Sequence, residues 1–146
     1  MENSKKSKDR EFTTIMFDID FFKQVNDNYG HAGGDAVLIS FAQLLQKEIS
    51  SPNIVGRVGG EEFLAILYLS PDEAQEFCVK LIYKINHNFV DFEGTKIKIS
   101  SSGGVAFSTE TKTSADLINK ADERLYEAKK NGRNRFTLPN SELLGE

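Results

Sequence analysis

Short apolar runs along the chain predict β-strands. Residues 12–17 (FTTIMF) are apolar and β-branched and too short for a helix, which fits a buried central strand. Two more runs, residues 53–58 and 63–69, are separated by GGEE. They predict a hairpin in which Gly59 and Gly60 supply the positive φ angles of a tight turn.

Strand signals continue towards the end of the chain. Residues 96–107 are rich in β-forming residues and contain Gly103 and Gly104. Residues 135–138 predict an edge strand that Pro139 closes, followed by a short polar tail.

Between the apolar runs at residues 12–17 and 53–58, the spacing of apolar residues predicts helices. Residues 21–30 predict a short helix broken at Gly30, and a clearer helix follows it. The apolar stripe of that second helix is formed by Leu38, Phe41, Ala42, Leu45 and Ile49.

Two further helices carry start signals. Ser70, Pro71 and Glu73 form a capping box with proline at the first helical position. Thr113 opens a fourth helix, and Gly132 is expected to end it. The apolar stripes are Ala74, Cys78, Leu81 and Ile85 in the third helix, and Leu117, Ala121, Leu125 and Ala128 in the fourth.

The order of these elements is strand, helix, hairpin, helix, strand, helix, strand. It predicts an α+β fold of the ferredoxin-like type, in which helices pack on a mixed central sheet. The chain has 146 residues, which fits a single domain.

Composition narrows the classes of function. The 18 Lys and Arg residues against 22 Asp and Glu give a net charge of −4, which argues against nucleic acid as a partner. The single cysteine, Cys78, lies on an apolar stripe, so we expect a core residue and not a nucleophile. No apolar run approaches the ~18 residues of a membrane span, and no signal peptide is present. We therefore expect a cytoplasmic domain without membrane contact, whose parent protein could still be membrane-anchored.

Acidic residues stand where the first strand ends and where the hairpin turns. A carboxylate at the end of a buried strand is costly to desolvate unless it is paired or bound to a metal. We expect Asp20 to cap the following helix and Asp18 to be a ligand of a hard cation such as Mg²⁺. Glu61 and Glu62 should point to opposite faces of their strand, one towards the metal and the other towards solvent.

Residues after the acidic strand end offer groups for a phosphorylated ligand. Phe21, Phe22 and Lys23 begin a helix, and the N–H groups at a helix N-terminus can bind phosphate. Asn26 and Asp35 together can read a guanine edge, although turn or capping roles fit the same residues.

Basic residues near the end of the fourth helix have two interpretations. Lys129 and Arg133 either complement the helix dipole or neutralise phosphate. His31 and His87 are not spaced as metal ligands with each other.

Three separated segments together resemble the GGDEF family of diguanylate cyclases, with GGEEF as the variant of its signature. They are FDIDFFKQVNDNYGHAGGDAVL (residues 17–38), RVGGEEF (residues 57–63) and ADERLYEAKKNGRNRF (residues 121–136). The resemblance spans roughly residues 12–137 and implies a ferredoxin-like core related to nucleotidyl cyclases and polymerase palms. It also implies the condensation of two GTP into cyclic di-GMP and pyrophosphate, a reaction of bacterial second-messenger signalling.

The resemblance assigns roles to the matching positions. Asp18, the Ile19 carbonyl and Glu61 are implied as ligands of Mg²⁺ or Mn²⁺, with two ions per GTP. Glu61 and Glu62 are the acids of the catalytic signature, and the base is one of them or water. The implied nucleotide-binding residues are Phe21, Phe22, Lys23, Asn26, His31, Asp35, Gly59, Gly60, Lys129 and Arg133.

Two departures from the family pattern shape the expected organisation. Family domains usually begin with a DxLTGLxNR-like stretch, which is absent before Asp18. We therefore expect residues 1–146 to form one catalytic domain trimmed at its N-terminus, with an upstream sensor or regulatory domain outside this chain. Ser50 and Asn53 replace the arginine and aspartate of the inhibitory RxxD motif, so no inhibitory product site is expected.

The resemblance also implies that the working unit is a homodimer, because each of two domains contributes one bound GTP. Two alternatives to an active cyclase stay open. The domain could bind GTP or cyclic di-GMP without turnover, or it could be an excised fragment that folds without activity.

Overall fold

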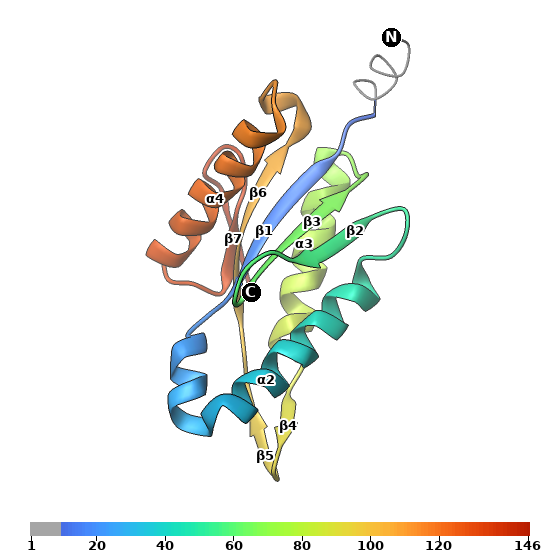
Figure 1. Cartoon of the computed structure of the whole chain (residues 1–146). Coiled ribbons are helices and arrows are strands. Elements are labelled where there is room, and N and C mark those ends of the chain that lie inside the picture. Colours follow the sequence, from blue (N-terminus) through green and yellow to red (C-terminus); the bar gives the residue numbers. More distant parts are fainter. Residues whose placement is uncertain (1–9) are drawn as a thin grey trace.

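A six-stranded mixed sheet organises the computed structural model, which describes residues 10–146 (Figure 1). The strands lie in the order β2-β3-β1-β6-β7-β8, and only β6 and β7 run parallel to each other. Their bounds are β1 Thr13–Ile19, β2 Ile54–Arg57, β3 Glu62–Leu67, β6 Ser101–Phe107, β7 Arg135–Thr137 and β8 Leu143–Gly145. A separate hairpin of β4 (Val90–Phe92) and β5 (Thr95–Ile97) projects beyond this sheet (Figure 1).

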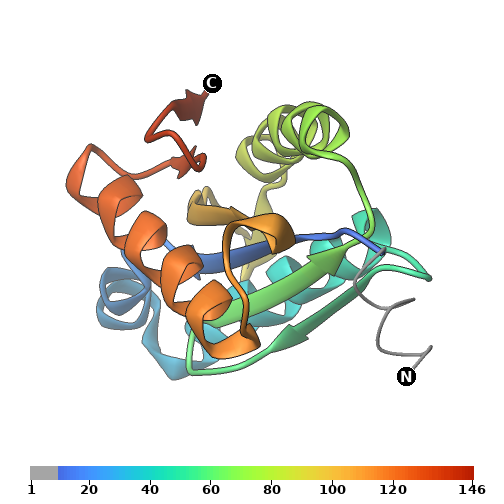
Figure 2. The ribbon, with the colours of Figure 1, turned by 90° about the horizontal axis from the view of Figure 1, so that it is seen from above.

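Helices cover both faces of the sheet. They are α2 (Phe22–Glu48), α3 (Pro71–Asn86) and α4 (Ser114–Lys130), with a short 3₁₀ turn, η1, at Ser108–Glu110. One hydrophobic core joins the sheet to α2 and α3, and a smaller one joins it to α4. In Figure 2, α3 and α4 accordingly lie on opposite sides of β1. None of the helices within residues 10–146 combines the length and apolar character that crossing a membrane requires.

This topology confirms the predicted ferredoxin-like α+β fold. The chain runs β1-α2-β2-β3-α3-β6, and the corresponding strands lie side by side in the order β2-β3-β1-β6. That is the βαββαβ arrangement with its first strand in the middle of the sheet.

Strand β1 is the central element, and all seven of its residues are buried. The prediction of a buried central strand is therefore confirmed. Because side chains alternate along a strand, Ile15, Phe17 and Ile19 enter the larger core, whereas Met16 packs in the core under α4. The next residue on the side of Met16 is Asp18, so the strand aims a carboxylate at α4.

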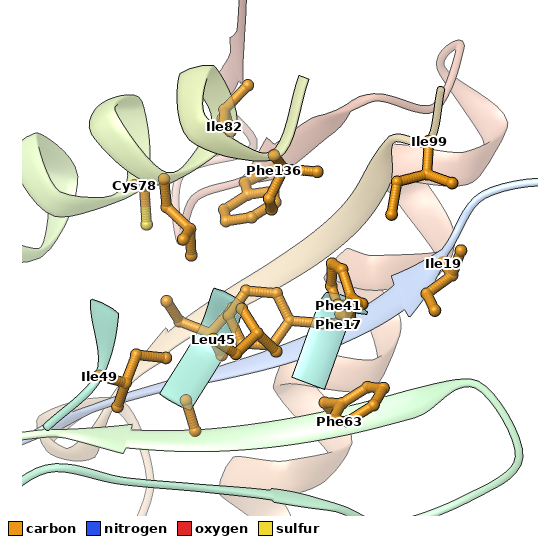
Figure 3. Close-up of a cluster of buried hydrophobic side chains, with 14 of the residues drawn as sticks. Phe17, Ile19, Phe41, Leu45, Ile49, Phe63, Cys78, Ile82, Ile99 and Phe136 are labelled. Atoms are coloured by element: carbon orange, nitrogen blue, oxygen red, sulfur yellow. The ribbon is translucent and has the colours of Figure 1, made fainter. Parts of the chain in front are cut away.

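Four phenylalanines, Phe17, Phe41, Phe63 and Phe136, lie among the aliphatic side chains of the larger core (Figure 3). The Phe17 ring makes edge contacts with Phe41 and Phe136, with ring centroids 6.4 and 5.5 Å apart. Each such ring contributes roughly 2–3 kcal/mol by leaving water. Cys78 lies in the same core, as predicted, and burial raises the pKa of its thiol to about 12.

Local signals in the sequence set the helix ends. Ser70 Oγ accepts from the Glu73 N–H and Glu73 Oε1 from the Ser70 N–H, so the predicted capping box forms. Thr113 caps α4 in the same way, through the Asp116 N–H. Gly132 follows the end of α4 with φ +123°, as predicted.

The first long helix bends as predicted at Gly30, which has φ 76° and ψ 176° inside α2. Glycine is required there because this backbone conformation places a Cβ in steric conflict. The bend divides α2 into a short first limb and a longer second limb (Figure 1).

The prediction of an edge strand at residues 135–138 is wrong. Strand β7 pairs with β6 on one side and with β8 on the other, and Phe136 is fully buried. The reason lies in the tail, where Leu143 and Leu144 supply a short apolar segment that turns back and adds the outer strand.

The conformation expected for the signature hairpin is also wrong, although the hairpin itself forms. The glycines with positive φ in the described chain are Gly30, Gly94 and Gly132. Gly59 and Gly60 do not need such angles because four residues, 58–61, connect β2 to β3 in place of a two-residue turn. The N–H groups of Val58 and Gly59 both donate to the Glu62 carbonyl, which closes this wider loop.

The run at residues 96–107 divides into two strands of different sheets. Strand β5 pairs with β4 in the projecting hairpin, whereas β6 pairs with β1 in the main sheet. The hairpin turns at Glu93 and Gly94, both with positive φ. Strand β4 is not predictable from the sequence, because its three residues carry too little periodicity.

Helix α4 lies so close to β6 that the strand has room only for a glycine at position 104. A Cβ on Gly104 would collide with the backbone of Ala121 and Leu125 in α4.

We expect Gly104→Ala to lower the free energy of unfolding by about 3 kcal/mol or more, because the backbone of α4 or β6 must shift to make room for the new methyl group. Gly56→Ala, on the exposed strand β2 with open space around its Cβ, is the matched control and should change stability by less than ~0.5 kcal/mol. Chemical denaturation of both variants measures the difference, and equal stabilities would contradict the close packing.

Candidate functional site

A polar pocket lies at one end of the central strand, where four segments meet. They are the end of β1, the start of α2, the connection between β2 and β3, and the end of α4. The pocket is lined by Asp18, Ile19, Phe21, Phe22, Lys23, Gln24, Asp27, Glu61, Lys129 and Arg133. Apart from Gln24 and Asp27, each is a site residue predicted from the sequence.

The Asp18 carboxylate is buried in this pocket beside a lysine. Asp18 is 3% exposed and pairs with the ammonium group of Lys129, in the last turn of α4. Burial raises the pKa of Asp18 above its usual range, against the lowering effect of Lys129. One carboxylate oxygen, Oδ1, is buried without a hydrogen-bond partner among the described residues.

Glu61 reaches the same pocket from the hairpin. The Ile19 N–H donates to the Glu61 carbonyl at 3.3 Å, which ties the loop to the end of β1. Burial raises the pKa of Glu61, and the nearby charge of Asp18 raises it further. Glu62 does not line this pocket, and its side chain lies beside Gly59. The two adjacent acids thus face different surroundings, as strand alternation predicts.

The pocket's acidic residues fit one hard cation that a ligand helps to coordinate. Within residues 10–146, no cluster of three or more His, Cys, Asp or Glu side chains could enclose a metal alone. The buried and unpartnered Oδ1 of Asp18, with Glu61 across the pocket, supplies two carboxylates. Mg²⁺ commonly binds through one or two carboxylates and completes its shell with phosphate oxygens and water.

The first turn of α2 presents backbone N–H groups at the pocket. Phe21 precedes the helix in the left-handed conformation, with φ 56°, and within the described chain no side chain caps this end. The first N–H groups of a helix have no partner inside the helix, so those of Phe22, Lys23 and Gln24 can bind an anion. The exposed Lys23 and Asp27 form an i,i+4 ion pair at 3.6 Å on the same turn.

The end of α4 turns sharply beside the pocket. The Arg133 N–H donates to the Ala128 carbonyl and the Gly132 N–H to that of Lys129, which is a Schellman motif. Arg133 itself has φ 63°, and its guanidinium lies 4.8 Å from the centroid of the Phe21 ring. The loop thereby places a second cation beside Lys129 at the rim.

Asp20 does not cap α2, so that prediction is wrong. Its carboxylate is buried and accepts hydrogen bonds from Ser100 Oγ, Ser102 Oγ and the Asn134 N–H, at 2.6, 2.6 and 2.8 Å. These partners come from distant parts of the sequence, so no local signal identifies them. Phe21 takes the cap position instead.

The predicted guanine readers lie farther along α2, outside the pocket lining. Asn26, on the first limb, is half-buried, while His31 and Asp35 are exposed. A Cβ on Gly34 would collide with the side-chain oxygen of Asn26, so this glycine allows the two limbs to approach each other. The bend therefore brings Asn26 next to the residue that precedes Asp35.

The two residues at the expected inhibitory position lie away from the pocket lining. Asn53 Oδ1 accepts from the Tyr68 N–H at 2.8 Å and so fastens the start of β2 to the end of β3. Ser50 is exposed.

An apolar groove lies between α2 and the β2–β3 hairpin, and Arg57 is the only charged residue that lines it.

Sequence reasoning missed Gln24 and Asp27 as lining residues, and it missed the anchoring role of Asp20. Gln24 lies in the first turn of α2 and Asp27 one turn further on, so their helical positions could have identified them. Asp20 could not have been identified in this way, because its partners Ser100, Ser102 and Asn134 lie 80, 82 and 114 positions away in the sequence.

Comparison with known proteins gives one consistent result. The family profile described as "Diguanylate cyclase, GGDEF domain" matches residues 1–135. Diguanylate cyclase A of Treponema denticola is 35% identical over 143 residues, which cover 97% of this chain and 38% of that protein. The chain thus spans well under half the length of this relative.

Solved structures agree with this result. The GGDEF domain of YfiN (TpbB) from Pseudomonas aeruginosa superposes with a TM-score of 0.86 at 28% identity, covering 93% of this chain and 86% of that one. The GGDEF domain of DgcB from Caulobacter crescentus, in complex with c-di-GMP, superposes with a TM-score of 0.87 at 25% identity. It covers 95% of this chain and 84% of the other.

The raised pKa of Glu61 makes a prediction about stability. A folded-state pKa above the ordinary value of 4.5 means that ionisation of this group opposes folding, so its contribution worsens as pH rises through the folded pKa. We expect Glu61→Gln to raise the melting temperature at neutral pH in a chelating buffer, and to lose that advantage below pH 4.5. Thermal melts across pH check this, with the exposed Glu76→Gln as control. A gain that persists unchanged in acid would contradict the electrostatic cause.

Proposed function

The chain belongs to the GGDEF family of diguanylate cyclases, and on that premise we propose that it condenses two GTP molecules into cyclic di-GMP and pyrophosphate. One observation carries the proposal. A single pocket combines the Asp18 and Glu61 carboxylates with the Lys129 and Arg133 cations. The uncapped start of α2 lies beside them, where Lys23 and Asp27 pair with each other. That combination suits a triphosphate bound together with a divalent metal.

The groups of the pocket divide the work of binding GTP. Asp18, the Ile19 carbonyl and Glu61 are proposed to hold Mg²⁺ or Mn²⁺, which when bound offsets phosphate charge and acidifies a coordinated hydroxyl. The N–H groups of Phe22 and Lys23 would bind the terminal phosphate. The matched nucleotide positions also include Phe21, His31, Gly59, Gly60, Lys129 and Arg133.

The base is proposed to bind near the bend of α2. Asn26 and Asp35 together offer an amide and a carboxylate, which can pair with the guanine edge. Gly34 supports this assignment, because its lack of a side chain lets Asn26 lie against the segment that carries Asp35.

In the reaction, the 3′-hydroxyl oxygen of one GTP bonds to the α-phosphorus of the other, and pyrophosphate leaves. The hydroxyl proton passes to Glu61, to Glu62 or to water. In a second such step, the remaining 3′-hydroxyl of the linear intermediate bonds to the α-phosphorus at its other end, which releases a second pyrophosphate and closes the ring. Two chains facing each other would hold the two GTP molecules in the orientation that each attack needs.

The proposed activity is tested by incubating the chain with GTP and Mg²⁺ and resolving the products by mass. Cyclic di-GMP and pyrophosphate support the proposal. GTP binding without product indicates a binding domain or a chain that cannot dimerise alone. A leucine zipper fused to the N-terminus separates these two, because only the second gains activity when dimerised.

The metal assignment predicts the effect of removing either carboxylate. We expect Asp18→Ala and Glu61→Ala each to lower product formation by at least about a thousandfold, since each removes one of very few hard ligands. Product is measured at saturating Mg²⁺ in the dimerised chain. Glu76→Ala, on the exposed face of α3, is the control and should keep full activity. Normal turnover by either pocket variant would show that the metal is held elsewhere.

The base assignment predicts a change in nucleotide selectivity. Adenine lacks the N1–H that guanine offers to a carboxylate, and an unpaired polar group costs about 1–3 kcal/mol, or roughly tenfold to a hundredfold. We expect Asp35→Ser to reduce the preference for GTP over ATP by that factor in direct competition binding. Asp122→Ser, at an exposed position on α4, controls for the loss of charge. Unchanged selectivity of Asp35→Ser would place guanine recognition elsewhere.

A further inference from the structure

We propose that Asp20 is a positioning residue that fixes the Arg133 side of the pocket through the backbone of Asn134. The inference rests on the proposed function, in which Arg133 binds phosphate. Asp20 does not line the polar pocket that holds Asp18 and Arg133. It therefore acts on the position of Arg133 and does not contact the substrate.

The Asp20 carboxylate joins three segments that are far apart in the sequence. Oδ1 accepts from Ser102 Oγ at 2.6 Å, and Oδ2 accepts from Ser100 Oγ at 2.6 Å and from the Asn134 N–H at 2.8 Å. Asp20 is 3% exposed, so these charge-assisted bonds are shielded from water. The end of β1 is thereby fastened to the start of β6 and to the loop after α4.

That loop needs an external anchor because of its backbone. Arg133 and Asn134 have φ 63° and 51°, two consecutive non-glycine residues in the left-handed region. Such conformations are unfavourable for L-residues and persist only when the surroundings hold them. The Schellman bonds hold the Arg133 N–H from the helix side, and Asp20 holds the Asn134 N–H from the sheet side.

The anchor controls where two pocket residues meet. Phe21 directly follows Asp20, and Arg133 directly precedes the residue that Asp20 binds. The Arg133 guanidinium lies 4.8 Å from the centroid of the Phe21 ring, and both residues line the pocket. One buried carboxylate therefore sets the relative position of the helix start and the second cation.

Asp20→Asn is the variant that tests this role. Its amide can keep the network closed, because a serine hydroxyl can turn to accept from the new NH₂ group, so we expect the variant to fold. The Asn134 N–H then meets a neutral acceptor, and the loop is held less firmly. We expect the affinity for a non-hydrolysable GTP analogue with Mg²⁺ to fall by about tenfold, while the affinity for guanosine stays unchanged.

A double-mutant cycle separates positioning from general damage. If Asp20 acts through Arg133, Asp20→Asn should cause no further loss of analogue affinity in the Arg133→Ala background. Glu110→Gln is the matched control, since the Glu110 carboxylate also accepts three hydrogen bonds, from Phe107 and Arg124, away from the pocket. It should lower the melting temperature without changing the ratio of analogue to guanosine affinity.

A second variant, Ser100→Ala, and hydrogen exchange of the Asn134 amide test the same role of Asp20. Ser100→Ala removes one hydroxyl donor and retains the charge, so it gives a smaller loss of the same kind if Asp20→Asn does not fold. Hydrogen exchange of the Asn134 amide, measured without any nucleotide, should be faster in both variants.

The outcomes are distinct. Equal losses of analogue and guanosine affinity, or additive losses with Arg133→Ala, overturn the positioning role. If the wild-type chain binds no GTP analogue, the proposed function fails. The hydrogen exchange of the Asn134 amide then remains as the test of whether Asp20 holds the loop. Unchanged exchange in Asp20→Asn overturns the inference in either case.

Discussion

A carboxylate buried at the end of a central strand is the constraint on which the site depends. Asp18 is nearly inaccessible to water, and a buried charge is tolerated only beside a counter-charge or a metal. The alternation of β1 turns Asp18 towards α4, whose last turn supplies Lys129. Fold and site are therefore linked, because the helix that covers the second face of the sheet also supplies the cation that neutralises the strand end.

Close approach of backbone segments makes that arrangement possible. Gly104 lets β6 lie directly against α4, and Gly34 lets the two limbs of α2 approach each other. Polar contacts then hold the closely packed segments in place. Asp20 holds the loop after α4 against the sheet, and the Arg124 guanidinium of α4 binds the Glu110 carboxylate. The contacts of Asp20 are shielded from water because its carboxylate is buried.

Membership of the GGDEF family connects this geometry to a reaction between two bound nucleotides. This pocket lies where β1 and α4 end and α2 begins. Asp18 pairs directly with Lys129 there, so a carboxylate of the sheet and a cation of α4 meet inside the pocket. Asn26 and Asp35, which the proposed function assigns to the base, lie farther along α2 and outside that pocket.

The sequence by itself determined most of the elements and the buried central strand, because these follow from local patterns. Asp18 ends an apolar run and could be assigned from its neighbours, whereas Glu61 and Lys129 were assigned through the resemblance of three separated segments to a family. Only the tertiary structure decided the role of Asp20 and the place of β7 inside the sheet. Both depend on partners distant in the chain, namely Asn134 for the carboxylate and the tail strand β8 for β7, and periodicity carries no information about such pairs.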